Sequence, residues 1–104
     1  MEVNVLERYN SRTIDELGRL GLHSELRQRL DLKPGGMVSL KIIDEMVILQ
    51  HEENFAEFDG VICEINDLGM ITVPTQIRDV LGWKEKDKIS FHHTNDVIIL
   101  NSAG

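Results

Sequence analysis

Short runs of branched and apolar residues, separated by glycine and polar turn residues, predict a chain of strands with two short helices. The predicted order in each half of the chain is strand, strand, helix, strand, strand. One helix is expected to begin with Ser24 as its N-cap, and the other at Pro74, with Thr75 sharing the capping. The strands are expected at residues 12–14, 19–22, 37–43, 46–49, 61–65, 70–73, 88–92 and 97–100, the first two of each half forming a β-hairpin.

The two halves repeat each other at a constant offset of 51 residues, without a gap. Identical residues recur at this offset, and conservative pairs such as Leu20/Ile71 lie between them. A gapless repeat of this length indicates a duplicated module. The identical pairs are Ile14/Ile65, Leu17/Leu68, Gly18/Gly69, Arg27/Arg78, Leu30/Leu81, Lys33/Lys84, Ser39/Ser90, Ile48/Ile99 and Leu49/Leu100.

Each copy is close to the size at which a separate hydrophobic core becomes marginal, which is about 40 residues. We therefore expect the two copies to bury their apolar faces against each other as a pseudo-symmetric pair. The expected organisation is repeat 1 at residues 1–50, an acidic linker at residues 51–60 and repeat 2 at residues 61–104. The expected fold class is mainly β with short helices, built from two β-β-α-β-β repeats.

Basic residues are concentrated in the first half, although the whole chain has a formal net charge of −7. Residues 1–51 contain seven basic and eight acidic side chains, whereas residues 52–104 contain four basic and ten acidic ones. Five of the six arginines lie in the first half. The acidic total argues against binding of nucleic acid by charge alone. Any function that depends on positive charge is therefore expected in repeat 1.

Several reactive side chains are expected to be structural. The chain has no catalytic motif, so we expect no enzyme activity, no small-molecule substrate and no cofactor. The histidines lack the spacing of a metal site, since His92 and His93 are adjacent on a strand and point to opposite faces. Cys63 and Trp83 are expected in the core.

A single cysteine is typical of a reduced, cytoplasmic protein, and no segment is apolar enough to span a membrane.

Residues 12–19, followed by the helix from Ser24 to Leu30, resemble the AbrB/SpoVT family of swapped-hairpin domains. Residues 66–74, followed by Ile77, Arg78, Leu81 and Gly82, resemble the same pattern. The resemblance implies that the two repeats interlock their hairpins into one small β-barrel. This would be an intramolecular pseudo-dimer, similar in layout to MraZ-type tandem relatives. It also implies a prokaryotic transcription regulator that binds double-stranded DNA.

The resemblance further assigns DNA contacts to arginines before the first turn, after it and on the helix. In repeat 1 the matching positions hold Arg12, Arg19 and Arg27, and Arg29 stands close by on the helix. In repeat 2 only Arg78 is basic. The other matching positions of repeat 2 hold Cys63, Met70 and Asp79. Repeat 2 therefore resembles a half that completes the fold.

Repeat 1 also departs from the family pattern, since His23 stands where a proline usually precedes the helix, as Pro74 does in repeat 2. Asp31 stands at the position of Gly82.

The alternative interpretation of the arginines is surface ion pairing. Asp15 could pair with Arg19 within the turn, and Glu25 with Arg29 along the helix. Asp15 and Asp67 are expected to stabilise their turns. Two functions remain open: a DNA-binding transcription regulator that contacts DNA through repeat 1, or a protein-interaction module that kept the fold and lost strong DNA binding. A homodimer is expected, because one basic half alone offers few phosphate contacts.

Overall fold

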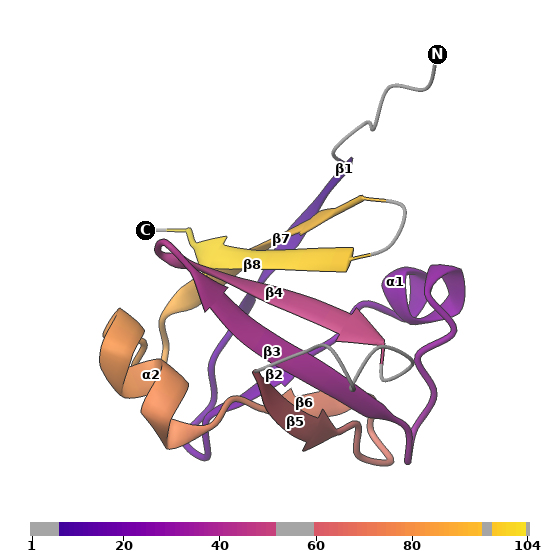
Figure 1. Cartoon of the computed structure of the whole chain (residues 1–104), viewed down its shortest axis with the longest axis horizontal. Helices are drawn as coiled ribbons and strands as arrows, with labels where there is room; N and C mark the ends of the chain where they lie inside the picture. Colours follow the sequence, from indigo (N-terminus) through magenta and orange to yellow (C-terminus); the bar gives the residue numbers. More distant parts are fainter. Residues whose placement is uncertain (1–6, 52–59, 95–96, 104) are drawn as a thin grey trace.

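The computed structural model describes residues 7–51, 60–94 and 97–103. In these ranges the chain forms eight strands and two helices, in the repeated order that the sequence predicts (Figure 1). The elements of repeat 1 are β1 (Glu7–Thr13), β2 (Arg19–Gly21), α1 (Ser24–Arg29), β3 (Met37–Ile43) and β4 (Met46–His51). Those of repeat 2 are β5 (Val61–Glu64), β6 (Met70–Thr72), α2 (Thr75–Leu81), β7 (Lys88–His93) and β8 (Val97–Ser102).

Most strands belong to one antiparallel sheet in the order β1-β7-β8-β4-β3-β5, and β2 pairs with β6 in a separate two-stranded ladder. The prediction of a mainly β fold with short helices is confirmed. Among the described residues the six-stranded sheet has two edges, β1 and β5, and does not close into a barrel. The helices lie at opposite ends of the strands, α1 near the end of β4 and α2 near the turn between β3 and β4 (Figure 1).

Strand pairing is exchanged between the repeats. β1 of repeat 1 pairs with β7 of repeat 2, and β5 of repeat 2 pairs with β3 of repeat 1. The β2–β6 and β4–β8 pairs also cross from one repeat to the other. The two arms of each predicted hairpin are thus joined by a tight turn but take their ladder partners from the other repeat. Neither repeat could satisfy the backbone hydrogen bonds of these strands alone.

The hydrophobic core follows the same two-fold pattern. All buried hydrophobic residues of the core except one form pairs at the 51-residue offset. These pairs are Ile14/Ile65, Leu20/Ile71, Leu22/Val73, Leu26/Ile77, Leu32/Trp83, Val38/Ile89, Leu40/Phe91, Val47/Ile98 and Leu49/Leu100. The exception is Cys63, whose counterpart in repeat 1 is Arg12. The predictions that Trp83 and Cys63 are buried are confirmed.

The helix starts differ by one residue from the prediction. The N-cap of α1 is His23 rather than Ser24, and that of α2 is Pro74, and neither makes a side-chain capping hydrogen bond. Proline holds φ near the value that this position needs. His23 reaches nearly the same backbone conformation, with φ −58° and ψ 137° against −58° and 146° for Pro74.

The residue with positive φ after each helix stands at the matching position, although α1 ends at Arg29 and α2 ends one position later, at Leu81. Asp31 has φ 55° where Gly82 has φ 70°, so the aspartate adopts the left-handed conformation that glycine normally supplies. His51, which the sequence places in the linker, ends β4. Residues 52–59 of the predicted linker lie outside the described residues. Neither described helix is long and apolar enough to cross a membrane.

Candidate nucleic-acid interface

Arg12 occupies the one position at which the two-fold core is broken. It lies in β1 opposite Ile89, as Cys63 lies in β5 opposite Val38. Cys63 is buried, and burial raises the pKa of its thiol. The Arg12 side chain is instead exposed, and its guanidinium makes no hydrogen bond or ion pair with a residue in the ranges that the structure describes. A guanidinium therefore projects from a position that the fold uses elsewhere for packing.

Arg19 is held by the turn that precedes it. The Oδ1 atom of Asp15 accepts the backbone amides of Leu17 at 2.9 Å and Arg19 at 2.8 Å. Its Oδ2 atom accepts Arg19 Nε at 2.6 Å. The hydrogen bond from the Arg19 amide is the main cause that lowers the pKa of Asp15 below its usual value, and the Arg19 side chain lowers it further. The predicted pairing of Asp15 with Arg19 is confirmed.

The corresponding turn of repeat 2 has the same geometry without the charge. The Oδ1 atom of Asn66 accepts the backbone amides of Leu68 and Met70, each at 2.9 Å. The prediction that Asp67 stabilises this turn is wrong, because Asn66 supplies the oxygen, at the position that matches Asp15. An amide oxygen serves as well as a carboxylate in this type of turn.

Arg27 and Arg78 join the two repeats. Arg27 Nε donates to the carbonyl oxygen of Leu22 at 3.1 Å, and Arg78 Nε donates to that of Val73 at 2.8 Å. Each guanidinium also covers the turn glycine of the other repeat. A Cβ added at Gly69 would lie 2.6 Å from Arg27 Cζ, and one added at Gly18 would lie 2.6 Å from Arg78 Cζ.

Arg29 forms the ion pair that the helical spacing predicts. Its Nη2 atom lies 3.2 Å from Glu25 Oε1, and both side chains are exposed. Such an i, i+4 pair contributes only about 0.3–0.5 kcal/mol and is weakened by salt. The pair therefore contributes little to the stability of α1.

The structure distributes the five predicted DNA-binding arginines over two places. Arg27 and Arg29 lie on α1, and Arg12 lies beside His23, the residue that precedes this helix. Arg19 instead follows Gly18, against which Arg78 packs. The exchange of strands thus brings an arginine of repeat 2 to the first turn of repeat 1.

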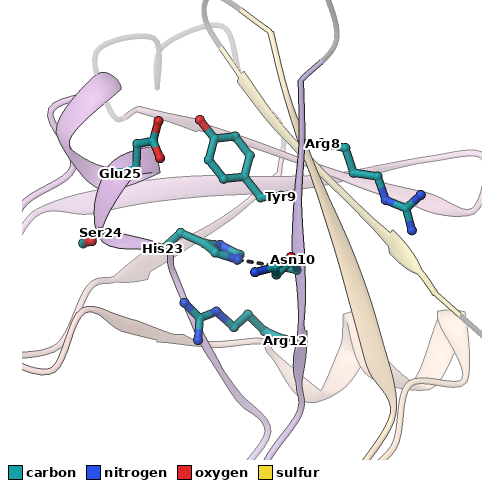
Figure 2. A pocket seen from close by; sticks show the side chains of 7 residues that line it. All are labelled: Arg8, Tyr9, Asn10, Arg12, His23, Ser24 and Glu25. Carbon is teal, nitrogen blue, oxygen red and sulfur yellow. Dashed lines mark hydrogen bonds between the residues drawn. The ribbon is translucent and has the colours of Figure 1, made fainter.

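A shallow pocket of about 450 Å³ lies between β1 and the start of α1 (Figure 2). Its centre is the buried ring of His23, whose Nε2 atom lies 2.6 Å from the carbonyl oxygen of Asn10. In Figure 2 the Arg12 side chain extends below this ring, whereas Arg8 extends to the other side of β1. The pocket is lined by Arg8, Tyr9, Asn10, Arg12, His23, Ser24 and Glu25.

His23 is held as a neutral imidazole. Burial is the main cause that lowers its pKa below the usual value, and the charge of Arg12 lowers it further. Since a carbonyl oxygen can only accept, Nε2 carries the proton and donates it to Asn10. The Nδ1 atom is buried and has no hydrogen-bond partner among the described residues. The ring packs between Tyr9, at a centroid distance of 5.5 Å, and Phe91, at 4.9 Å.

Sequence reasoning identified the departure at His23 but gave it no role, and it assigned nothing to Tyr9 or Asn10. The alignment of the two repeats could have pointed to these residues, because His23 stands at the position of Pro74 and Tyr9 at the position of Gly60. Within residues 7–51, 60–94 and 97–103, no group of three or more acidic, histidine or cysteine side chains could hold a metal ion. Comparison of the sequence with known protein families and with curated proteins finds no match.

Proposed function

We propose that this protein is a DNA-binding transcription regulator of the AbrB-like type, in which repeat 1 contacts DNA. The observation that carries the proposal is Arg12. Nine pairs of core residues obey the repeat, and the single exception replaces a buried cysteine by an exposed arginine. Packing does not require an arginine there. Its planar guanidinium is suited to phosphates and to guanine edges.

The exchanged strand pairing supports the family assignment. In a swapped-hairpin domain, the hairpin arms of one copy pair with strands of the other copy, as β1 and β5 do here. We propose that the β2–β6 ladder and the six-stranded sheet are the two parts of such a barrel, made within one chain. The two repeats then take the place of the two subunits of a single-copy relative.

The charge distribution favours binding through repeat 1, and binding as a homodimer. Of the candidate arginines, Arg27 and Arg78 help to hold the fold, and Arg19 is shared with Asp15. One molecule therefore offers only a few cations to DNA. Two copies would present two repeat 1 surfaces and raise the number of phosphates that the protein neutralises.

The direct test measures the affinity for duplex DNA by fluorescence anisotropy at increasing salt. The triple variant Arg12→Ala/Arg19→Ala/Arg29→Ala should have a shallower slope of log K against log salt, by about 0.9 for each phosphate that it no longer neutralises. The matched control is Lys84→Ala/Lys86→Ala/Lys88→Ala, which removes the same charge from repeat 2. Equal reductions of the slope in both variants would contradict the assignment to repeat 1.

A protein-interaction module is the second candidate, and exposed apolar side chains favour it. Ile43 at the end of β3, Ile62 in the edge strand β5 and Val80 in α2 are exposed large apolar side chains. Their counterparts in the other repeat are polar: Thr94, Ser11 and Arg29. No binding of wild type to DNA at low salt would leave this candidate in front.

A further inference from the structure

The outer part of β1 is shifted by one residue relative to its partner strand. Tyr9 lies opposite Phe91, but Arg12 lies opposite Ile89, so Asn10 and Ser11 share one partner position. This is a β-bulge. Among the described residues it has no counterpart in repeat 2, because β5 pairs with β3 in a continuous register from Glu64–Met37 to Val61–Leu40.

Comparison of the repeats shows what the bulge changes. Val61, the counterpart of Asn10, lies opposite Leu40, the counterpart of Phe91. Without a bulge, Asn10 would therefore lie opposite Phe91. A register shift by one residue places every side chain that precedes the bulge on the other face of the sheet. The bulge thus turns Tyr9 inward and Arg8 outward, and the regular register would turn Arg8 toward the interior.

One hydrogen bond joins this bulge to the helix. Its donor is His23 Nε2 and its acceptor is the carbonyl oxygen of Asn10, a bulge residue. At the position of His23, repeat 2 has Pro74, whose side chain cannot donate a hydrogen bond. The described strand β5 of repeat 2 has no bulge between Val61 and Glu64. The repeat that has the histidine donor therefore has the bulged strand, and the repeat that has proline has the regular strand.

The surroundings keep the ring neutral and in place. From β1, Tyr9 contacts the ring and Arg12 lies beside it, and from α1 Glu25 is the nearest acid. From β7, Phe91 packs edge-on against the ring, and buried His93 packs against Tyr9 at 6.3 Å. The ring is thus fixed from three elements, and its donor is aimed at the bulge.

We infer that His23 is a positioning residue that pins the β1 bulge and so holds Arg12 at a fixed place relative to α1. Arg12 directly follows the bulge, and the arginines of α1 begin four residues after His23. The hydrogen bond therefore sets the spacing between the cations on β1 and those on α1. The part of this inference that concerns DNA rests on the proposed function, whereas the pinning of the bulge does not.

Two variants separate the donor from the shape of the residue. His23→Pro installs the residue of repeat 2 in a backbone conformation that suits it, and removes the donor. His23→Gln keeps an amide donor near the position of Nε2 and cannot titrate. Both variants are measured for DNA affinity and, by NMR, for the register of β1 against β7. Backbone NOEs report this register, because Tyr9 lies opposite Phe91 with the bulge and Asn10 would lie opposite Phe91 without it.

We expect His23→Pro to remain folded, to shift β1 so that Asn10 pairs with Phe91, and to bind DNA about tenfold more weakly, the effect of one hydrogen bond. His23→Gln should keep Tyr9 opposite Phe91 and restore affinity to within about twofold of wild type. A proline variant with the wild-type register overturns the inference, and so does a glutamine variant as impaired as the proline one. If wild type binds no DNA, the proposed function fails, and the register alone still decides whether His23 pins the bulge.

Discussion

At the scale of single residues, the two repeats act as controls for each other. Asp15 and Asn66 build the same turn, and only Asp15 adds a charge and an ion pair with Arg19. The acid therefore holds the arginine without being needed for the turn. This separation makes the role of Arg19 testable without disturbing the fold.

The variant Asp15→Asn should strengthen DNA binding. It keeps the oxygen that accepts the amides of Leu17 and Arg19, and it releases the Arg19 guanidinium for a phosphate. We expect the slope of log K against log salt to steepen by about 0.9, the effect of one added phosphate contact. The measurement is the anisotropy salt series. Asn66→Asp is the control, because Met70 stands at the position of Arg19 in that turn, so the change releases no guanidinium and should not steepen the slope.

The neutral state of His23 predicts a pH dependence of stability. Because the pKa of His23 is lower in the folded state, the unfolded chain binds more protons, and the free energy of unfolding rises with pH. This contribution is complete above the unfolded value of about 6.5 and is lost as the pH falls below it. Urea unfolding of wild type and His23→Gln between pH 5 and 8, a range chosen about that value, should show a shallower dependence in the variant. Equal dependences would mean that His23 is not buried as a neutral ring.

At the scale of elements, the sequence predicted that the strands exist, but it missed most of β1, which begins at Glu7 rather than at residue 12, because its residues are almost all polar. The local pattern also did not reveal the ladder partners of the strands. Alternating apolar residues identify a strand from local pattern, and the repeat identified β1 and β2 as equivalents of β5 and β6. Which strand pairs with which depends on contacts between residues far apart in sequence. The bulge in β1 was hidden for the same reason, since Tyr9 and Asn10 reveal it only through their register with Phe91.

Two turns contain a glycine that an arginine of the other repeat covers, and substitution of these glycines is expected to destabilise the fold. Gly18 has φ 79° and Gly69 has φ 77°, and each is covered by a guanidinium from the other repeat. An alanine at either site must adopt a strained backbone and displace an arginine. We expect Gly18→Ala and Gly69→Ala each to lower the free energy of unfolding by about 2–4 kcal/mol, measured by urea denaturation.

Two other glycines separate the contributions to this cost. Gly35 has φ 85° with no atom within 4 Å of an added Cβ, so Gly35→Ala adds only the backbone strain, about 1–2 kcal/mol. Gly21 has open space and no positive φ, so Gly21→Ala should change stability by less than about 0.5 kcal/mol. If Gly18→Ala costs no more than Gly35→Ala, the packing of Arg78 against the turn contributes nothing.

At the scale of the whole molecule, the paired core and the exchanged strands make the repeats interdependent. We expect a single cooperative unfolding transition for the whole chain, because β1, β2 and β5 pair only with strands of the other repeat among the described residues. A separately expressed repeat 1 should be unfolded, or folded only as a dimer that replaces repeat 2. Circular dichroism and sedimentation measure both properties. A folded monomer of repeat 1 would contradict the interdependence.

The candidate site was predictable to a similar extent. The sequence identified Arg12 and the asymmetry between the repeats, because both are visible when the halves are aligned. It could not show that Arg27 and Arg78 hold the opposite turns, since those contacts form only after the strands exchange. Their double role makes Arg12, Arg19 and Arg29 the better residues for testing DNA contact.

DNA binding through repeat 1 can be tested directly by an NMR titration of the isotopically labelled protein with a short DNA duplex. This mode of binding predicts that backbone amide signals shift in β1 near Arg12, in the turn from Asp15 to Arg19 and in α1. Signals of β5 and of the turn between β3 and β4, which do not pair with β1, should stay close to their starting positions. Shifts centred on α2, or no shifts at low salt, would contradict DNA binding through repeat 1.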